Sequence, residues 1–263
     1  MKAKDIINAM DSWADSKLID SWDNTGFQVG CDDSHIERIL VALDTNEDVL
    51  NTAIKENYQM IITHHPIIFK PLNSITNRTY KERLILSAIR EDITIYNAHS
   101  NLDLAIGGVN DILADMLELK NATCLSISKI YDDKIYGYGR IGDIEKRTAI
   151  EYLGLVKSKL DVDYISVFGD INKSISRVAV CGGSGSDFIY DAYKMGADIY
   201  ITGDIKYHDA EMAVQLGLLL ADAGHYHTEK IILSEIKKYL DERFHNEIYI
   251  KIYEEPSVKC QLY

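Results

Sequence analysis

Ile61-Ile62-Thr63-His64-His65-Pro66 is the stretch that decides the fold, because an apolar run stops there at two adjacent histidines and a proline. The apolar run predicts a buried strand, and the proline removes a backbone N–H and so prevents further pairing in a sheet. Ligands of open α/β sheets gather at the carboxyl ends of strands, where these two imidazoles would lie. Neutral histidine is a common ligand for zinc, iron and other transition metals. The stretch therefore predicts a metal site at a strand end, with a pair of surface histidines in a turn as the alternative.

A second strand-like run, residues 218–221, is followed by Asp222-Ala223-Gly224-His225-Tyr226-His227-Thr228-Glu229. If a helix begins near His225, then His225 and Glu229 lie four residues apart on one face. Side chains at that spacing can hold one ion between them. The alternative is an ordinary helix start, where the helix dipole favours an acidic side chain in any case.

A third strand-like run, residues 93–96, is followed by Asn97-Ala98-His99-Ser100-Asn101-Leu102-Asp103. The two oxygens of Asp103 could bridge two metal ions, and His99 could support a ligand or carry a proton. Two divalent ions about 3.5–4 Å apart, sharing a hydroxide, perform hydrolysis in many enzymes. Five residues are the predicted ligands of such a pair: His64, His65, Asp103, His225 and Glu229.

Composition narrows the class of protein. The chain has 263 residues, with 28 basic and 41 acidic side chains and a net charge of −13, which argues against a nucleic-acid-binding surface. A nucleotide substrate is still compatible, because metal cations can receive its phosphates. No apolar run approaches the roughly 20 residues of a membrane span, and the first residues suggest an amphipathic helix instead of a signal peptide.

The cysteines are widely scattered and form no CxxC pair; they are Cys31, Cys124, Cys181 and Cys260. Reduced, structural thiols in a cytoplasmic protein are the expectation. No GxSxG motif or local cysteine-nucleophile signature is present, so covalent catalysis by serine or cysteine fits poorly.

The chain repeats a strand–helix–strand pattern in its two halves. Residues 38–64 carry it first, and residues 177–204 carry it again, so that Ile62-Thr63-His64-His65 aligns with Ile201-Thr202-Gly203-Asp204. The pattern predicts an α/β protein of two related lobes whose strand ends face a shared cleft. Ligands from both halves would meet there as a dinuclear metal site in the interlobe cleft.

The expected division is 1–123 for the first lobe and 124–224 for the second, with 225–263 forming a helix and strand that return to the first lobe. Residues 135–141 and 164–168 alternate in polarity, which predicts antiparallel strands and hence a mixed sheet in the second lobe.

Two further segments leave alternatives open. The glycine cluster Gly182-Gly183-Ser184-Gly185 could cradle a phosphate through its N–H groups or could form a plain tight turn. Trp22-Asp23-Asn24-Thr25-Gly26-Phe27 could line a pocket and stack on a base, or could be a polar turn before a strand.

Five ordered motifs resemble the NIF-three-like family (NGG-interacting factor three), also known as GTP cyclohydrolase I type 2 homologues. The resemblance covers nearly the whole chain. The motifs are Trp22-Asp23-Asn24-Thr25-Gly26, Thr63-His64-His65-Pro66, His99-Ser100-Asn101-Leu102-Asp103, Thr202-Gly203-Asp204-Ile205-Lys206-Tyr207-His208 and Gly224-His225-Tyr226-His227-Thr228-Glu229. The chain is too short for the insertion that some members carry between their lobes, and Ser100 stands where threonine is expected in many relatives.

The resemblance implies a dinuclear metal site with the same five ligands and a ring-shaped homohexamer. It also implies an enzyme of the GTP cyclohydrolase type, which opens the imidazole ring of a purine nucleotide and releases formate. Three imidazole ligands favour zinc, iron or manganese over magnesium, and two such ions per chain are expected.

The resulting hypothesis is a divalent-metal-dependent hydrolase acting on a small-molecule substrate, with no nucleic-acid or membrane partner. His99 and His208 would shuttle protons or orient the substrate, and Asp204 would hold one of them in place. Trp22, Asp23 and Asn24 would contact the substrate or support the ligands. Two rivals are a non-catalytic metal-binding or regulatory scaffold protein and a purely structural role for the histidines.

Overall fold

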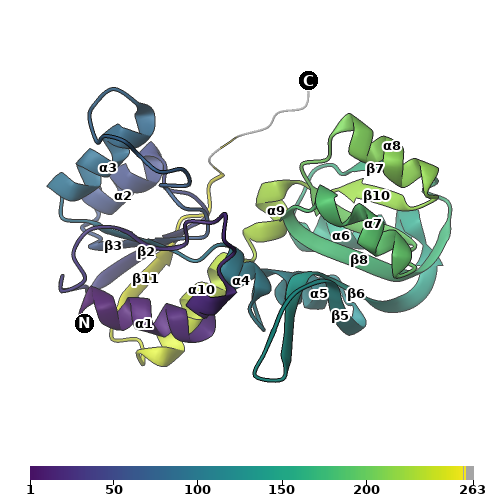
Figure 1. The fold of residues 1–263 in the computed structure, drawn as a ribbon, viewed down its shortest axis with the longest axis horizontal. Coiled ribbons are helices and arrows are strands. Elements are labelled where there is room, and N and C mark those ends of the chain that lie inside the picture. The colour runs from purple at the N-terminus through teal and green to yellow at the C-terminus, as the bar shows by residue number, and fades with distance from the viewer. Residues whose placement is uncertain (257, 259–263) are drawn as a thin grey trace. The chain divides into compact units, whose positions relative to one another are not determined.

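The computed structural model describes residues 1–256 and residue 258, and it divides the chain into two compact units (Figure 1). The first unit contains Met1–Leu102 and Leu233–Tyr263, and the second contains Asp103–Ile232. These boundaries differ from the sequence-based division at 123/124 and 224/225. Residues just after 102 join the second unit because Leu113 and Leu117 pack in that unit's core. The chain passes from the first unit to the second between Leu102 and Asp103, and it returns between Ile232 and Leu233.

The first unit contains one mainly parallel sheet. Its strands are β1 (Gly26–Val29), β2 (Arg38–Ala42), β3 (Met60–Thr63), β4 (Thr94–Asn97) and β11 (Tyr249–Ile252), in the order β1-β4-β3-β2-β11. β1 is antiparallel to β4, and the other neighbours are parallel. Strands β3 and β4 are buried at every position, as expected for parallel strands that are covered on both faces.

Helices cover both faces of this sheet. They are α1 (Ala3–Trp13), η1 (Ser16–Leu18), α2 (Glu47–Lys55), α3 (Tyr80–Arg90) and α10 (Ile232–Arg243), while α4 (Ser100–Leu104) spans the unit boundary. Figure 1 shows α2 and α3 over one face and α1 and α10 over the other. Because successive side chains of a strand point to opposite faces, Leu40, Ile61 and Ile95 form one apolar cluster with α2 and α3.

The second unit contains a mixed sheet. Its strands are β5 (Lys120–Tyr131), β6 (Lys134–Thr148), β7 (Ser166–Phe168), β8 (Ser174–Ser184), β9 (Ile199–Gly203) and β10 (Leu219–Asp222), in the order β5-β6-β8-β9-β10-β7. β8, β9 and β10 are parallel, and the other neighbours are antiparallel. Residues 135–141 therefore lie in an antiparallel strand, as predicted, and the segment 164–168 does so from Ser166 onward.

Two apolar clusters cover the faces of the second sheet. The helices are α5 (Val109–Met116), α6 (Ala149–Leu160), η2 (Ser186–Phe188), α7 (Ile189–Lys194), α8 (Tyr207–Gln215) and α9 (His225–Glu229). Val178 and Val180 face the cluster that includes α5 and α6. Ala179 and Cys181 face the cluster that includes α7 and α8, as the two-residue period of a strand requires.

The two units repeat one topology. β2-α2-β3-α3-β4 in the first corresponds to β8-α7-β9-α8-β10 in the second, and each last strand pairs with an antiparallel strand, β1 or β7. Equivalent hydrogen bonds fix the register: Ala98 N donates to Thr63 O (3.0 Å), and Ala223 N donates to Thr202 O (2.8 Å). Thr63 therefore corresponds to Thr202, as the sequence comparison predicted.

Cys31, Cys124 and Cys181 are free thiols, and Cys260 lies outside the described residues. Burial raises the pKa of the Cys181 thiol to about 12, so this side chain is a neutral core residue. No helix in the described part of the chain is long and apolar enough to cross a bilayer.

We predict that Tyr200→Phe lowers the free energy of unfolding by about 1 kcal/mol, because it removes one buried hydrogen bond, while Gly185 O keeps the bond from Phe188 N (3.1 Å). The fully buried Tyr200 hydroxyl donates to Gly185 O at 2.8 Å. Tyr207→Phe is the control, since Tyr207 is 78% exposed and the same change there should stay within about 0.5 kcal/mol. Urea unfolding followed by circular dichroism measures both; equal effects would contradict the prediction.

Candidate metal centre

The two adjacent histidines lie immediately after β3, where the sequence placed them. His64 is fully buried, and its Nδ1 donates to Ala98 O at 2.8 Å, just beyond the end of β4. The His65 Nδ1 donates to Asp44 Oδ1 at 2.8 Å, and Asp44 follows the neighbouring strand β2. The carboxyl ends of three parallel strands thus fix both rings.

His99 is held by Asp23, which belongs to the polar segment at residues 22–27. Its Nδ1 donates to Asp23 Oδ1 at 2.9 Å, and the Asp23 side chain is fully shielded from solvent. The same carboxylate accepts from the Ser100 hydroxyl (2.6 Å) and the Thr25 hydroxyl (2.6 Å). Burial favours the neutral form of Asp23, but the hydrogen bonds from His99, Ser100 and Thr25 outweigh it and hold the pKa of Asp23 well below its usual range. Asp23 is therefore an ionised acceptor that orients His99.

His64, His65 and His99 converge within the first unit. Each ring offers a nitrogen, and these three nitrogens lie within 4.8 Å of one another. Since every Nδ1 carries the hydrogen donated to an oxygen, the lone pair of each neutral ring is on Nε2. Metal-binding histidines nearly always donate their other ring N–H to a carboxylate or a backbone carbonyl in this way.

The second unit carries a histidine and a glutamate, His225 and Glu229, and the Nδ1 of this histidine also faces an oxygen acceptor. Helix α9 begins at His225, and the His225 Nε2 lies 2.9 Å from Glu229 Oε2. The His225 Nδ1 lies 2.8 Å from Asp204 Oδ2, and Asp204 directly follows β9. Glu229 is buried, whereas His225 is partly exposed. The expected one-face spacing of the histidine and the glutamate is thus present.

Asp103 also belongs to the second unit, at the end of α4. Its backbone carbonyl accepts from Asn110 Nδ2 at 3.0 Å, which ties α4 to α5. The charge of Asp103 contributes to the raised pKa of Cys181, so the carboxylate lies near the glycine-rich end of β8.

That glycine-rich end makes room for Glu229. Gly183 has φ +65°, and a Cβ there would lie 2.0 Å from Glu229 Oε1. The backbone N–H groups of the segment are already used: Gly182 donates to Asn110, Gly183 to Thr228 and Gly185 to Thr202. Of the two interpretations left open, the phosphate cradle therefore receives no support, and the close approach to a carboxylate explains the glycines.

The remaining predicted residues occupy different environments. Trp22 is 57% exposed, and its ring lies 6.0 Å from that of His99. The Asn24 side-chain amide donates to Ile68 O. The His208 side chain is 87% exposed on α8, where its Nδ1 lies 3.2 Å from Glu211. The proton-transfer role of His208 stays a prediction.

Sequence reasoning missed Asp44, and it singled out Gly183 without finding its role beside Glu229. Asp44 had a usable signal, because it directly follows the strand-like run that ends at Leu43, next to the strand that leads to His64. For Gly183 the glycine cluster was visible, but only the fold shows that its missing side chain admits Glu229.

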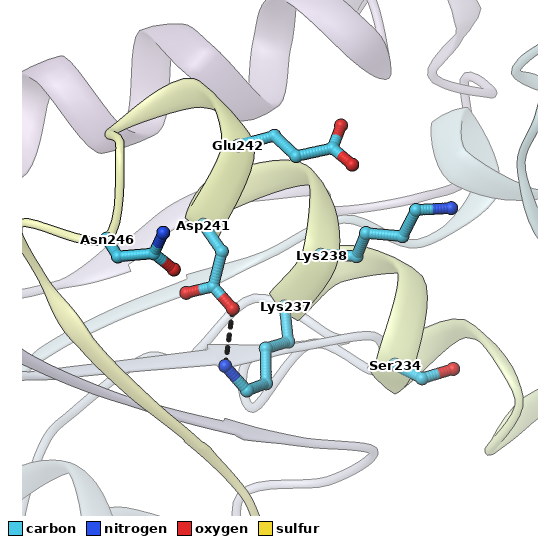
Figure 2. A pocket seen from close by; sticks show the side chains of 6 residues that line it. All are labelled: Ser234, Lys237, Lys238, Asp241, Glu242 and Asn246. Atoms are coloured by element: carbon cyan, nitrogen blue, oxygen red, sulfur yellow. Dashed lines mark hydrogen bonds and ion pairs between the residues drawn. The ribbon is translucent and has the colours of Figure 1, made fainter.

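A pocket lined by α10 contains none of the predicted site residues. Figure 2 shows its lining, and Lys237 there pairs with Asp241 one helical turn away. The lining residues are Ser234, Lys237, Lys238, Asp241, Glu242 and Asn246. A lysine and an aspartate at i and i+4 on a helix face are typical of a solvated surface.

Each unit thus offers donors that fit divalent metal ions. Imidazole nitrogens and carboxylate oxygens are the ligands of zinc, iron and manganese, and the oriented Nδ1 groups and the space left by Gly183 suit such ligands. The number of ions and the sharing of ligands belong to the proposal below.

Comparisons with known proteins identify the family of this chain. The family model described as Duf34/NIF3 (NGG1p interacting factor 3) matches residues 1–257. This chain belongs to that family. A "GTP cyclohydrolase 1 type 2 homolog" of Clostridium perfringens is 37% identical over 249 residues, which cover 94% of each chain. A protein of the same name from Methanocaldococcus jannaschii is 36% identical, over 94% of this chain and 98% of the relative.

Solved structures of the family share the fold. A Bacillus cereus protein described as related to NIF3 superposes with a TM-score of 0.93 at 25% identity, covering 100% of this chain and 99% of that one. Reduced HcgD from Methanocaldococcus jannaschii superposes with a TM-score of 0.81 at 32% identity, covering 96% of this chain and 97% of that one.

We predict that Gly183→Ala displaces the Glu229 carboxylate and lowers bound metal at least several-fold, because the new Cβ and Glu229 Oε1 cannot occupy the same space. Gly196→Ala is the matched control: Gly196 has φ +77° but open space around its Cβ position. It should lose about 1–2 kcal/mol of stability from the left-handed backbone while keeping its metal. Metal analysis and thermal unfolding of both variants make the comparison; equal metal content would contradict the prediction.

Proposed function

We propose that the protein is a divalent-metal-dependent hydrolase with a dinuclear centre. The proposed ligands are His64, His65, Asp103, His225 and Glu229. The observation that carries the proposal is that four imidazoles, His99 included, each have Nδ1 directed at an oxygen acceptor. For His64, His65 and His99 this arrangement leaves Nε2 as the coordinating or proton-accepting atom. The His225 Nε2 lies 2.9 Å from Glu229 Oε2, a separation that suits two ligands of one ion.

A centre built from both units is compatible with the path of the chain. Asp103 is the first residue of the second unit, and Glu229 lies four residues before Leu233, where the chain re-enters the first unit. Both proposed acidic ligands therefore adjoin a crossing between the units. We propose that the centre lies in the cleft between the two lobes, where Asp103, His225 and Glu229 join His64 and His65.

When bound, divalent metal ions would polarise the substrate and lower the pKa of a shared water, so that hydroxide forms near neutral pH. His99 Nε2 would accept a proton from the attacking water or return one to the leaving nitrogen, while ionised Asp23 holds the ring in position. Asp204, which the sequence led us to expect beside His99 or His208, contacts His225 instead and would orient that ring in the same manner. His208, exposed on α8, would deliver protons from solvent.

The proposed substrate is a purine nucleotide, and the proposed reaction is of the GTP cyclohydrolase type. The relatives' shared name, "GTP cyclohydrolase 1 type 2 homolog", supports this choice. One water would add to C8 of guanine and open the imidazole ring to a formamide, and a second water would release formate and leave a free amine. With a net charge of −13, the chain would need bound cations to receive triphosphate.

We predict about two zinc, iron or manganese ions per chain, with at least one lost in His65→Ala and in Glu229→Ala. His35→Ala is the matched control: its side chain is 68% exposed, and it should keep the full metal content. Inductively coupled plasma mass spectrometry on protein purified without chelator makes the measurement. No metal in the wild type, even after incubation with each of these ions, would overturn the proposal.

Turnover separates the hydrolase from a non-catalytic metal-binding or regulatory scaffold. Metal-loaded wild-type protein is incubated with GTP, and formate is measured. Metal-dependent formate that disappears in His65→Ala supports the hydrolase. The scaffold would be favoured if fully metallated protein released no formate from GTP and gave no product with a wider panel of nucleotides and phosphoesters.

We also propose that the protein forms a homo-oligomer, a hexameric ring by family resemblance. Strand β5 is an edge strand of the second sheet, and exposed isoleucines lie on it and at the start of β6. A long edge with exposed apolar side chains favours pairing with another chain.

Ile130→Glu should therefore lower the molar mass measured by light scattering, because Ile130 is 67% exposed on this edge strand. Ile150→Glu, at a position 54% exposed on α6, is the control and should leave the mass unchanged. A monomeric wild-type protein would overturn the oligomer without affecting the metal centre.

A further inference from the structure

Two exposed aromatic rings lie beside His99 in the first unit. Trp22 is 57% exposed and Phe69 is 39% exposed. Their ring centroids lie 6.0 Å and 6.3 Å from that of His99, and 6.2 Å from each other. Both rings stand nearly perpendicular to the imidazole, at 87° for Trp22 and 82° for Phe69. Three rings from three separate loops thus form one contiguous aromatic cluster next to His64 and His65.

The loops that carry Trp22 and Phe69 are braced against each other. The Asn24 side-chain amide donates to Ile68 O, and Ile68 N donates to Gln28 Oε1 at 3.3 Å. Gln28 closes the brace by donating from Nε2 to Asn24 O at 2.9 Å. Both rings therefore adjoin residues that are fixed by hydrogen bonds, although the rings themselves are exposed to solvent.

The neighbour of Trp22 links this brace to the histidines. Asp23 accepts from His99 Nδ1 and from the Ser100 hydroxyl, so the loop holds its tryptophan in a fixed relation to the imidazole. Exposing large apolar rings is unfavourable unless a partner covers them, and a braced backbone lowers the entropy lost when a ligand binds.

We propose that Trp22 and Phe69 form the receptor for a planar heteroaromatic ring, a purine base, whose edge is directed at His99. Stacking on an aromatic ring contributes about 1–3 kcal/mol per base and requires only a flat π-face. The tilt of 58° between Trp22 and Phe69 suits stacking on one ring and edge contact with the other. Phe69 is thereby a base-contacting residue that the sequence motifs did not reveal.

The inference deepens the proposed function by placing its substrate base, but binding through these rings does not require the metal ions. Failure of one proposal is therefore distinguishable from failure of the other. His65→Ala should lose metal and turnover and still bind the base, because the proposed stacking rings are those of Trp22 and Phe69.

Fluorescence of Trp22 gives a readout that is independent of activity. The chain has two tryptophans, and Trp13 packs 5.0 Å from Tyr239 on α10, so Trp13→Phe isolates the signal of Trp22. Guanosine titrated into this variant should quench the fluorescence saturably, whereas ribose should not. If Trp13→Phe fails to fold, equilibrium dialysis of labelled guanosine against wild type and Trp22→Ala replaces the titration.

Phe69→Ala should weaken guanosine binding about 5- to 150-fold, which corresponds to the 1–3 kcal/mol of one stacked base. Phe69→Tyr keeps the ring and should restore binding. Tyr190→Ala is the matched control, since Tyr190 is 49% exposed on α7 in the second unit, and it should bind as the wild type does.

Any of several results would overturn the inference. One is that guanosine either quenches no more than ribose does or shows no saturable binding. Another is an equal affinity of Phe69→Ala and Tyr190→Ala. The third is a lower molar mass for Trp22→Ala and Phe69→Ala without any loss of guanosine binding, which would assign the rings to contact with a second copy of the chain.

Discussion

The hydrogen bond from each imidazole Nδ1 to an oxygen acceptor is the interaction on which the rest of the site depends. For His64 the acceptor is the backbone carbonyl of Ala98, and for His65, His99 and His225 it is a carboxylate. A carbonyl and an ionised carboxylate accept only, so the bond fixes both the tautomer and the ring plane of His64, His65 and His99. The His225 ring is fixed in its plane by carboxylates at both nitrogens. The acceptors lie after strands or on adjoining loops, so the sheets must form before the rings can be oriented.

The repeated topology explains why polar groups collect at so few places. In each unit the chain runs from strand to helix to parallel strand twice, and the chemistry-bearing residues follow the second and third strands. The two halves differ at equivalent positions: in the aligned repeats His64 corresponds to Gly203, and His65 corresponds to Asp204. One half thus supplies imidazole where the other supplies a carboxylate that orients an imidazole.

Close approach of backbone to side chain is the second constraint. Glycine at position 183 adopts a left-handed conformation beside the Glu229 carboxylate, and the neighbouring N–H groups are bonded to Asn110, Thr228 and Thr202. The segment 182–185, whose sequence suggested an anion-binding loop, therefore packs closely against the Glu229 side chain. Its amides have partners within the unit, and its missing Cβ atoms provide the space.

The sequence by itself determined the strand ends, the residue types there and the helical spacing of His225 and Glu229, because hydrophobic period and local turn signals are properties of short segments. It also indicated the repeat and the mixed second sheet. Only the tertiary structure decided that Asp44 and Asp23 orient His65 and His99, that Gly183 makes room for Glu229, and that Phe69 lies beside Trp22. Those relations join residues from 21 to 76 positions apart, so they arise only when sheet pairing brings distant loops to one edge.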